Sequence, residues 1–122
     1  MRPTRCTAMI LMLAIITAAC APSGSGEPSA GTVPIARVAA EPPTGTFTTA
    51  GFFVDDGSGP RLCELLAESY PPQCAGAAVT LRVDDVALPT LSRADGVTWS
   101  DAPVTIVGRM DRDILVVEAV TR

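Results

Sequence analysis

The chemistry-bearing side chains of this 122-residue chain are mostly carboxylates, and several of the thirteen occur in close pairs. The pairs are Asp55 with Asp56, Asp84 with Asp85, and Asp111 with Asp113. Paired carboxylates can bind Ca²⁺ or act as the acid and base of glycoside hydrolysis. None of the pairs fits the twelve-residue EF-hand pattern, and all fall in turns or at strand ends, where Asp is common. We therefore expect solvated turns and assign no metal ligand.

Other catalytic arrangements are excluded by composition. The chain has no His, which rules out a Ser-His-Asp triad and zinc bound through His. It also has no Lys, so it lacks a P-loop lysine and a Schiff-base lysine. We expect a protein that is not an enzyme and that needs no cofactor.

The first twenty residues have the pattern of an export leader. Arg2 and Arg5 precede an apolar run over residues 7–19, and small residues lead to Cys20. The run has roughly 13 residues, fewer than the about 20 that a membrane-spanning helix needs. We expect residues 1–19 to be removed, together with Cys6.

The last four residues of this leader region, Thr17-Ala18-Ala19-Cys20, resemble the lipobox of bacterial lipoproteins, whose usual form is Leu-(Ala/Ser)-(Gly/Ala)-Cys. The resemblance implies that diacylglyceryl is attached to the Cys20 sulfur and that the chain is cut before Cys20. Thr17 departs from the usual Leu, and the alternative is an ordinary secretory leader cut near Ala19. Because two or three acyl chains anchor a protein stably, we expect it at the extracytoplasmic face of the cell membrane.

The net charge of the chain disfavours direct binding to nucleic acid or to anionic lipid headgroups. All nine basic residues are Arg, and two of them lie in the leader, so seven Arg face thirteen acidic residues afterwards. The net charge becomes −6, against −4 for the whole chain. An acidic body is a poor partner for nucleic acid or anionic headgroups. We expect no nucleic-acid partner, membrane contact through lipid on Cys20, and an envelope protein or ligand as partner.

Cys63 and Cys74 are the cysteines left in the body of the exported chain. Oxidation is permitted outside the cytoplasm, so we expect a disulfide between them. Closing this short loop contributes about 3 kcal/mol, which is large for a small domain. A redox role would favour Cys-x-x-Cys spacing and basic neighbours, whereas Glu64 and Glu68 lie nearby.

The remaining chain divides into a tether and one small domain. Residues 20–45 are rich in Pro, Gly, Ser and Ala and are expected to form a flexible tether after the lipidated cysteine. Within it, residues 33–38 are apolar enough to dock as an edge strand instead. Residues 46–122 form the expected disulfide-stapled domain.

The pattern of this domain is β-rich. We expect a strand over residues 46–54 with a bulge or tight bend at Gly51, a short helix over residues 61–69, and a half-buried strand around Val79, Leu81 and Val83. A loop over residues 86–103 follows, and then a hairpin. The hairpin strands are residues 104–110 and 114–120, joined by a tight turn.

These elements predict a mostly β fold with one short helix. Four or five strands with one helix are similar to the OB fold, a small, partly open barrel. An α+β roll, with the helix on an antiparallel sheet, is the alternative. Trp99 is a candidate ligand contact at the barrel mouth, although in a chain with five aromatic residues it more often closes the core.

Two further resemblances involve the second cysteine. Leu62-Cys63-Glu64 with Ser69-Tyr70-Pro71-Pro72-Gln73-Cys74 is similar to a segment of small uncharacterised envelope proteins of GC-rich bacteria, and brings no activity with it. The segment from Glu68 to Cys74 also resembles half of a Bowman-Birk protease-inhibitor loop. That resemblance implies Glu68 in the protease pocket and Ser69 after the scissile bond. Leu66 and Ala67 stand where that family has Cys and Thr, and the expected helix conflicts with an extended inhibitor loop.

Three functions follow as hypotheses. The leading one is a lipid-anchored, non-enzymatic interaction or binding module. The first alternative is a protease inhibitor that uses the loop around Glu68 and Ser69. The second is a weak glycan hydrolase, which needs two carboxylates facing one groove.

Overall fold

A computed structural model describes residues 31–121, and the expected leader and lipidated Cys20 lie outside these residues. Strands account for 57% of the structure and there is one short helix, which confirms the mostly β fold class. The elements, in order, are β1 (Thr32–Val33), α1 (Ile35–Ala40), β2 (Thr46–Asp55), β3 (Pro60–Ala67), β4 (Gln73–Arg82), β5 (Ser92–Ala94), β6 (Val97–Trp99), β7 (Val104–Asp111) and β8 (Ile114–Thr121).

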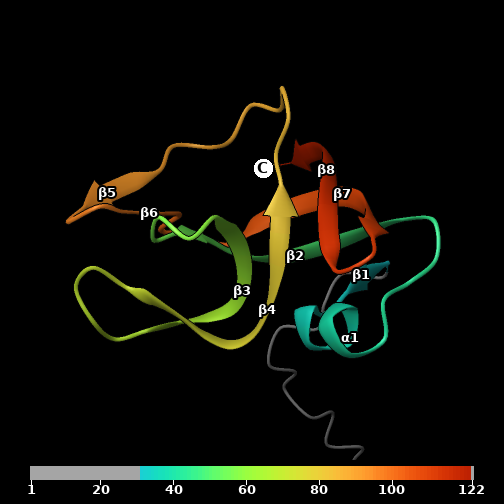
Figure 1. The fold of residues 1–122 in the computed structure, drawn as a ribbon, viewed down its shortest axis with the longest axis horizontal. Coiled ribbons are helices and arrows are strands. Elements are labelled where there is room, and N and C mark those ends of the chain that lie inside the picture. The colour runs from blue at the N-terminus through green and yellow to red at the C-terminus, as the bar shows by residue number, and fades with distance from the viewer. Residues whose placement is uncertain (1–30, 122) are drawn as a thin grey trace, which may run out of the picture.

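Five strands form a sheet that is partly closed on itself (Figure 1). β2 pairs with β3, β3 with β4, β8 with β7, and β7 with β2, all antiparallel. The ring is completed by β4 and β8, which run parallel to each other. This arrangement is consistent with the expected partly open barrel. The alternative roll does not describe it, because the sheet curves back to its first strand rather than lying open beneath the helix.

Gly51 marks the point where β2 changes partners. Residues 46–51 of β2 pair with β7, and residues 52–55 pair with β3. A Cβ atom at Gly51 would lie 2.6 Å from the backbone oxygen of Cys63. Only glycine allows so close an approach of two backbones, and this approach brings β3 against the second half of β2.

The prediction of a helix over residues 61–69 is wrong, because residues 60–67 form β3. Leu62, Leu65 and Leu66 have helical spacing, but Leu62 is buried while Leu65 is 57% exposed, so they do not share one buried face. Pairing with β2 on one side and β4 on the other provides the backbone hydrogen bonds. These distant partners decide the conformation.

The folded body also begins earlier than expected, so a tether extending to Gly45 is wrong. Within residues 33–38, only Val33 belongs to a strand, β1, which pairs in parallel with β2. Pro34 then starts α1, whose Ile35 and Val38 are buried in the core. Buried Thr49 donates a hydrogen bond of 2.7 Å to the Val33 carbonyl and fixes this segment to β2.

The main core lies between α1 and the inner faces of the strand ring. Its buried members are Ile35, Val38, Phe47, Phe53, Leu62, Val79, Leu81, Val104, Ile106, Leu115 and Val117. The predicted strand around Val79 and the hairpin of β7 and β8 are confirmed, and the latter turns at Arg112-Asp113. In the described part of the chain, no helix is long and apolar enough to cross a membrane.

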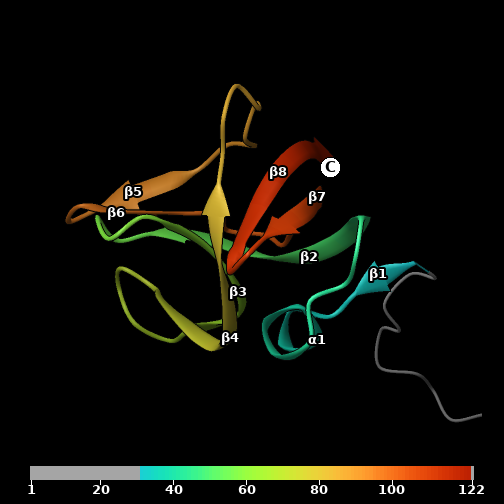
Figure 2. The ribbon, with the colours of Figure 1, turned by 45° about the vertical axis from the view of Figure 1, so that its right-hand side comes forward.

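The expected loop over residues 86–103 contains a second hairpin, β5–β6, which is a correction. Asp95 and Gly96 both have positive φ angles and join the two strands as a two-residue turn. β6 extends the second half of β2 by pairing with Val54 and Asp55. Figure 2 shows this hairpin beside the β2–β3 end of the sheet, away from α1.

Candidate functional site

The connection between β3 and β4 projects from the body of the protein (Figures 1 and 2). We call residues 68–72, between the two strands, the hairpin tip. Tyr70 in the tip is 80% exposed, and Leu65, three residues before the tip, is 57% exposed. These are the large hydrophobic residues that the described part of the chain leaves exposed. An apolar surface gathered on one projecting hairpin is typical of an interaction site.

A β-bulge directs this hairpin away from the ring. The register of β3 and β4 shifts by one residue between Cys63 and Leu65. Opposite the shift, Gly76 has a φ angle of 70°, and the Glu64 carboxylate accepts a hydrogen bond of 3.0 Å from the Ala77 backbone N–H. Bulges bend a strand and re-aim its side chains. The bulge therefore sets the direction in which the tip points.

The disulfide predicted between Cys63 and Cys74 is present, and it ties the base of the hairpin together. The Cα atoms of the two cysteines are 5.5 Å apart. Cys63 is fully buried in a small second core with Val54 and Trp99, and Cys74 packs against it. The hairpin therefore leaves the body from a covalently braced position.

Trp99 lies in the second core and contacts the hairpin tip. Its side chain is 6% exposed, and its ring packs edge to face with that of Tyr70, with centroids 6.0 Å apart. The Trp99 indole N–H donates a hydrogen bond of 2.9 Å to Asp101, whose other oxygen accepts one from Ser92. Trp99, the candidate ligand contact from the sequence, is thus a buried support for Tyr70, and Tyr70 is the exposed ring of the two.

A polar pocket of about 370 Å³ lies beside the hairpin tip. The β2–β3 turn, the start of β3, the β3–β4 connection and β6 all contribute to it. Its lining residues are Val54, Asp56, Arg61, Pro71, Pro72, Gln73, Cys74 and Val97. Its polar side chains, those of Asp56, Arg61 and Gln73, come from the β2–β3 turn, β3 and the start of β4.

Asp56 and Arg61 form the charged part of this pocket. Their side chains make a salt bridge of 2.6 Å. The pKa of Asp56 lies below its ordinary value of 3.8, because Ser58 donates hydrogen bonds from its hydroxyl and its backbone N–H, and because Arg61 is close. Arg61 Nε is shielded from solvent and has no hydrogen-bond partner within the described residues. The pocket holds an ion pair with donor capacity to spare.

The tip also carries the residues that resemble an inhibitor loop. Glu68 and Ser69 are exposed, the preceding residues form a strand rather than the expected helix, and Leu66 pairs with Cys74. However, the Ser69 N–H donates a hydrogen bond of 2.8 Å to the Ala67 carbonyl. The chain therefore bends sharply at Glu68, the residue that the resemblance places in a protease pocket.

The acidic pairs lie on three turns. Asp55 ends β2 and Asp56 begins the turn to β3, Asp84 and Asp85 follow β4, and Asp111 ends β7 with Asp113 in the turn to β8. Two of these turns meet at one guanidinium, because Arg82 lies 3.7 Å from Asp84 and 3.0 Å from Asp111. Both of these carboxylates are exposed. The described residues contain no group of three or more Asp, Glu, His or Cys side chains that could hold a metal ion.

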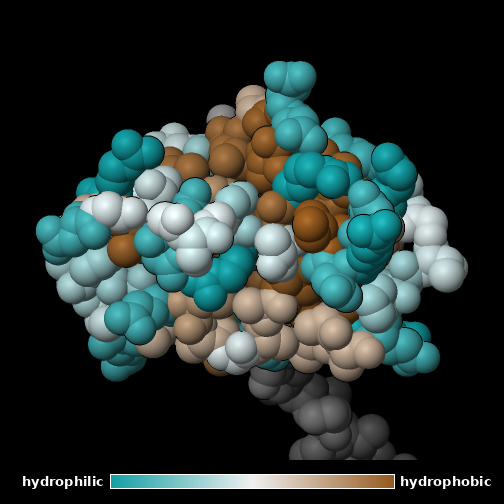
Figure 3. Space-filling model, in the orientation of Figure 1, coloured by the Kyte–Doolittle hydropathy of each residue, from teal (hydrophilic) through white to brown (hydrophobic). Residues whose placement is uncertain are grey.

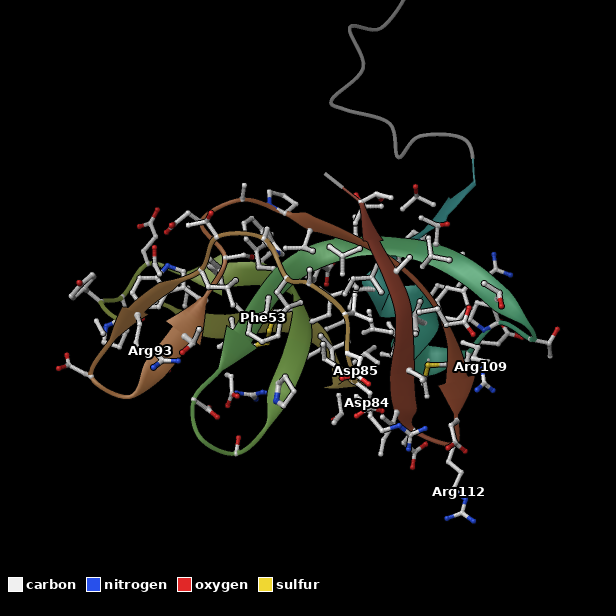
Figure 4. All side chains as sticks on the ribbon, turned by 90° about the horizontal axis from the view of Figure 1, so that it is seen from above. Phe53, Asp84, Asp85, Arg93, Arg109 and Arg112 are labelled. Carbon is white, nitrogen blue, oxygen red and sulfur yellow. A yellow bond between two sulfur atoms is a disulfide. The ribbon has the colours of Figure 1, made fainter. Side chains whose placement is uncertain are left out.

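The labelled arginines do not converge on one surface. In Figure 4, Arg93 lies on the β5–β6 hairpin, at the opposite end of the molecule from Arg109 and Arg112. Arg109 is paired with Glu118 at 3.1 Å, and Arg112 extends outward from the β7–β8 turn. Arg112 is therefore a suitable site for control substitutions far from the tip.

Apolar surface also gathers at a second place. Figure 3 shows it over the end of β4 and over β8, where the chain after β4 contributes partly buried Val83, Val86 and Leu88. These side chains pack against the main core. Their contact with the core makes this surface part of the body rather than a projecting element.

Comparisons of the chain with protein-family models, with curated proteins and with solved structures found no match. The site therefore rests on its own geometry. Sequence reasoning chose Cys63, Cys74 and Trp99, which the structure brings together, but missed Tyr70 and Arg61. Tyr70 could have been found from its position directly before Pro71-Pro72. Such a segment favours a turn, and the side chains of a turn are usually exposed.

Proposed function

We propose that this protein is a lipid-anchored, non-enzymatic binding module of the extracytoplasmic membrane face, and that the hairpin tip is its binding end. The observation that carries the proposal is Tyr70, which is 80% exposed yet held against buried Trp99. An aromatic ring costs free energy when it stands in water, and burial of such a ring at an interface recovers that free energy.

The bracing of the tip supports binding over a purely structural role. Binding loses free energy when loops and side chains must first be ordered. The disulfide at the base of the hairpin and the contact with Trp99 order the tip in advance. Tyr is also among the residues that most often dominate binding energy at interfaces.

The anchor is supported by sequence alone. The leader and Thr17-Ala18-Ala19-Cys20 have the pattern of a bacterial lipoprotein, and lipid on Cys20 would hold the body near a membrane. In the sequence, ten residues lie between Cys20 and Gly31, the first residue that the structure describes. The binding end would then act close to the membrane surface.

An affinity pull-down from intact envelope, with the lipidated protein as bait, tests the proposal. Three baits are compared: wild type, Tyr70→Ala, and Arg112→Ala as a control on the far β7–β8 turn. The proposal predicts that wild type and Arg112→Ala retain the same envelope component, and that Tyr70→Ala loses it. Equal retention by all three baits contradicts a binding end at the tip. Hydrolase turnover that disappears with Asp84→Asn or Asp111→Asn would contradict the non-enzymatic role.

A protease inhibitor is a second candidate, favoured by the exposed Glu68 and Ser69 and by the strand that precedes them. It predicts slow-dissociating inhibition of a serine protease that cleaves after Glu, which Glu68→Ala abolishes. The bend at Glu68 argues against it, because an inhibitor presents an extended segment at that residue. No inhibition across a panel of serine proteases ends this candidate.

A further inference from the structure

We propose that the polar pocket beside the hairpin tip binds an uncharged saccharide unit, and that Tyr70, which directly precedes the lining residue Pro71 in the chain, supplies a stacking surface for it. This inference rests on the proposed function and names the ligand class of the same site.

The charge of the pocket disfavours an anion. Asp56 already compensates the Arg61 guanidinium through their 2.6 Å salt bridge. A carboxylate or phosphate ligand would compete with Asp56 for Arg61 and would meet a chain of net negative charge. A cation would find the Asp56 carboxylate occupied by Arg61 and Ser58. An uncharged polar ligand avoids both costs.

The polar groups of the pocket fit hydroxyl groups. A guanidinium offers five N–H donors, and Arg61 uses one of its nitrogens, Nη2, in its hydrogen bond to Asp56. Asp56 supplies acceptor oxygens, and the exposed Gln73 side chain supplies both a donor and an acceptor. Each sugar hydroxyl donates one hydrogen bond and accepts others, so neighbouring hydroxyls match an adjacent donor and acceptor. A purely apolar ligand would leave these donors and acceptors without hydrogen-bond partners.

Arg61 also retains an unused donor, Nε, which is shielded from solvent. It has no hydrogen-bond partner among the described residues. Buried donors in folded proteins are usually paired, so an unpaired one calls for a specific explanation.

Size and shape agree with one or two sugar rings. The pocket holds about 370 Å³, near the lower end of the range of about 300–1,000 Å³ for small-molecule sites. Pro71 and Pro72 give it a stiff rim, and Tyr70 directly precedes them in the chain. Because Tyr70 is 80% exposed, its ring offers an apolar face to the C–H side of a sugar ring.

The test uses the full-length mature protein in detergent and an array of defined saccharides. The array carries neutral hexoses, N-acetylhexosamines and pentoses as oligosaccharides, together with uronic acid oligomers and a proline-rich peptide. The inference predicts saturable binding of at least one neutral oligosaccharide. Tyr70→Ala and Gln73→Ala should each weaken that binding tenfold or more. Arg112→Ala, on the β7–β8 turn far from the tip, should leave it within twofold.

One further variant tests the role of charge. Asp56→Asn removes the partner of the guanidinium, so the variant should gain affinity for uronic acid oligomers relative to wild type. Circular dichroism and melting of each variant show whether its fold is retained. The inference is overturned if no neutral saccharide binds, if binding is indifferent to Tyr70 and Gln73 in folded variants, or if only uronic acids or the peptide bind.

The outcomes separate this inference from the proposed function. If the envelope pull-down depends on Tyr70 while no neutral saccharide binds, the ligand class is wrong and the binding module remains. If neither assay depends on Tyr70, both proposals fail.

Discussion

Tyr70 and Trp99 pack edge to face, with ring centroids 6.0 Å apart, although they lie 29 positions apart in the sequence. One ring is almost fully exposed and the other almost fully buried. Trp99 in turn shares its core with the Cys63–Cys74 disulfide, so the exposed ring, the buried ring and the covalent link form one unit.

Loss of the disulfide should destabilise the domain strongly. In Cys63→Ser the cross-link is absent and a hydroxyl replaces a fully buried sulfur, so the free energy of unfolding should fall by about 2–5 kcal/mol. Urea unfolding of wild type and variant measures the change. Reduction of the wild type by dithiothreitol is the matched control and should lower stability in the same direction. Equal stability of the oxidised and reduced protein would show that the disulfide does not stabilise the domain.

Packing of α1 against the sheet should contribute strongly to the stability of the domain. Ile35→Ala removes a side chain that is buried in the main core, and should cost about 2–5 kcal/mol of stability. Arg37→Ala, on the exposed side of α1, should change stability by less than about 0.5 kcal/mol. Thermal melting of both variants gives the comparison. If residues 31–45 were a tether, the two variants would melt together.

The Asp56–Arg61 ion pair should persist into acid. Since the pKa of Asp56 is lowered in the folded protein, its charged form is favoured by folding. Its contribution is therefore present above the ordinary value of 3.8 and is lost only as the pH falls through the lower folded pKa. A titration followed by carboxyl ¹³C NMR should give a midpoint below 3.8, and Ser58→Ala should raise it, because Ser58 is the largest cause. A midpoint at or above 3.8 in the wild type would contradict the hydrogen bonding described for the turn.

The anchor makes a separate prediction. Cys20→Ala should abolish labelling by a fatty-acid analogue and block the cut before residue 20, while residues 31–121 still fold. The variant should then migrate as uncleaved precursor or leak into the medium. Cys63→Ser should keep the label and remain in the membrane fraction. A Cys20→Ala variant that still labels, or a wild type that never does, would refute the lipoprotein hypothesis.

Elements with strong local patterns could be predicted from the sequence. β2, β7 and β8 have alternating or β-branched residues that indicate a strand without knowledge of partners, and the short turn between β7 and β8 fixes their pairing. The disulfide followed from cysteine number and the expected compartment. β5 and β6 were also within reach, because Asp95-Gly96 is a strong two-residue hairpin signal.

Other elements depend on distant partners. The leucines of β3 have helical spacing, and only pairing with β2 and β4 makes the segment a strand. Ile35 and Val38 are two apolar residues in a Pro- and Ala-rich stretch, and their burial requires the finished sheet. Tyr70 is exposed because the hairpin projects, which a sequence shows only after β3 and β4 are recognised.

The central claim is that the hairpin tip is the binding end, and site-specific cross-linking in intact cells tests it most directly. A photoreactive phenylalanine analogue is placed at Tyr70 in one strain and at Arg112 in another, and cells are irradiated before denaturing electrophoresis. The account predicts a discrete cross-linked product from position 70 and none from position 112. A product from position 112 alone, or none from either position, would contradict it.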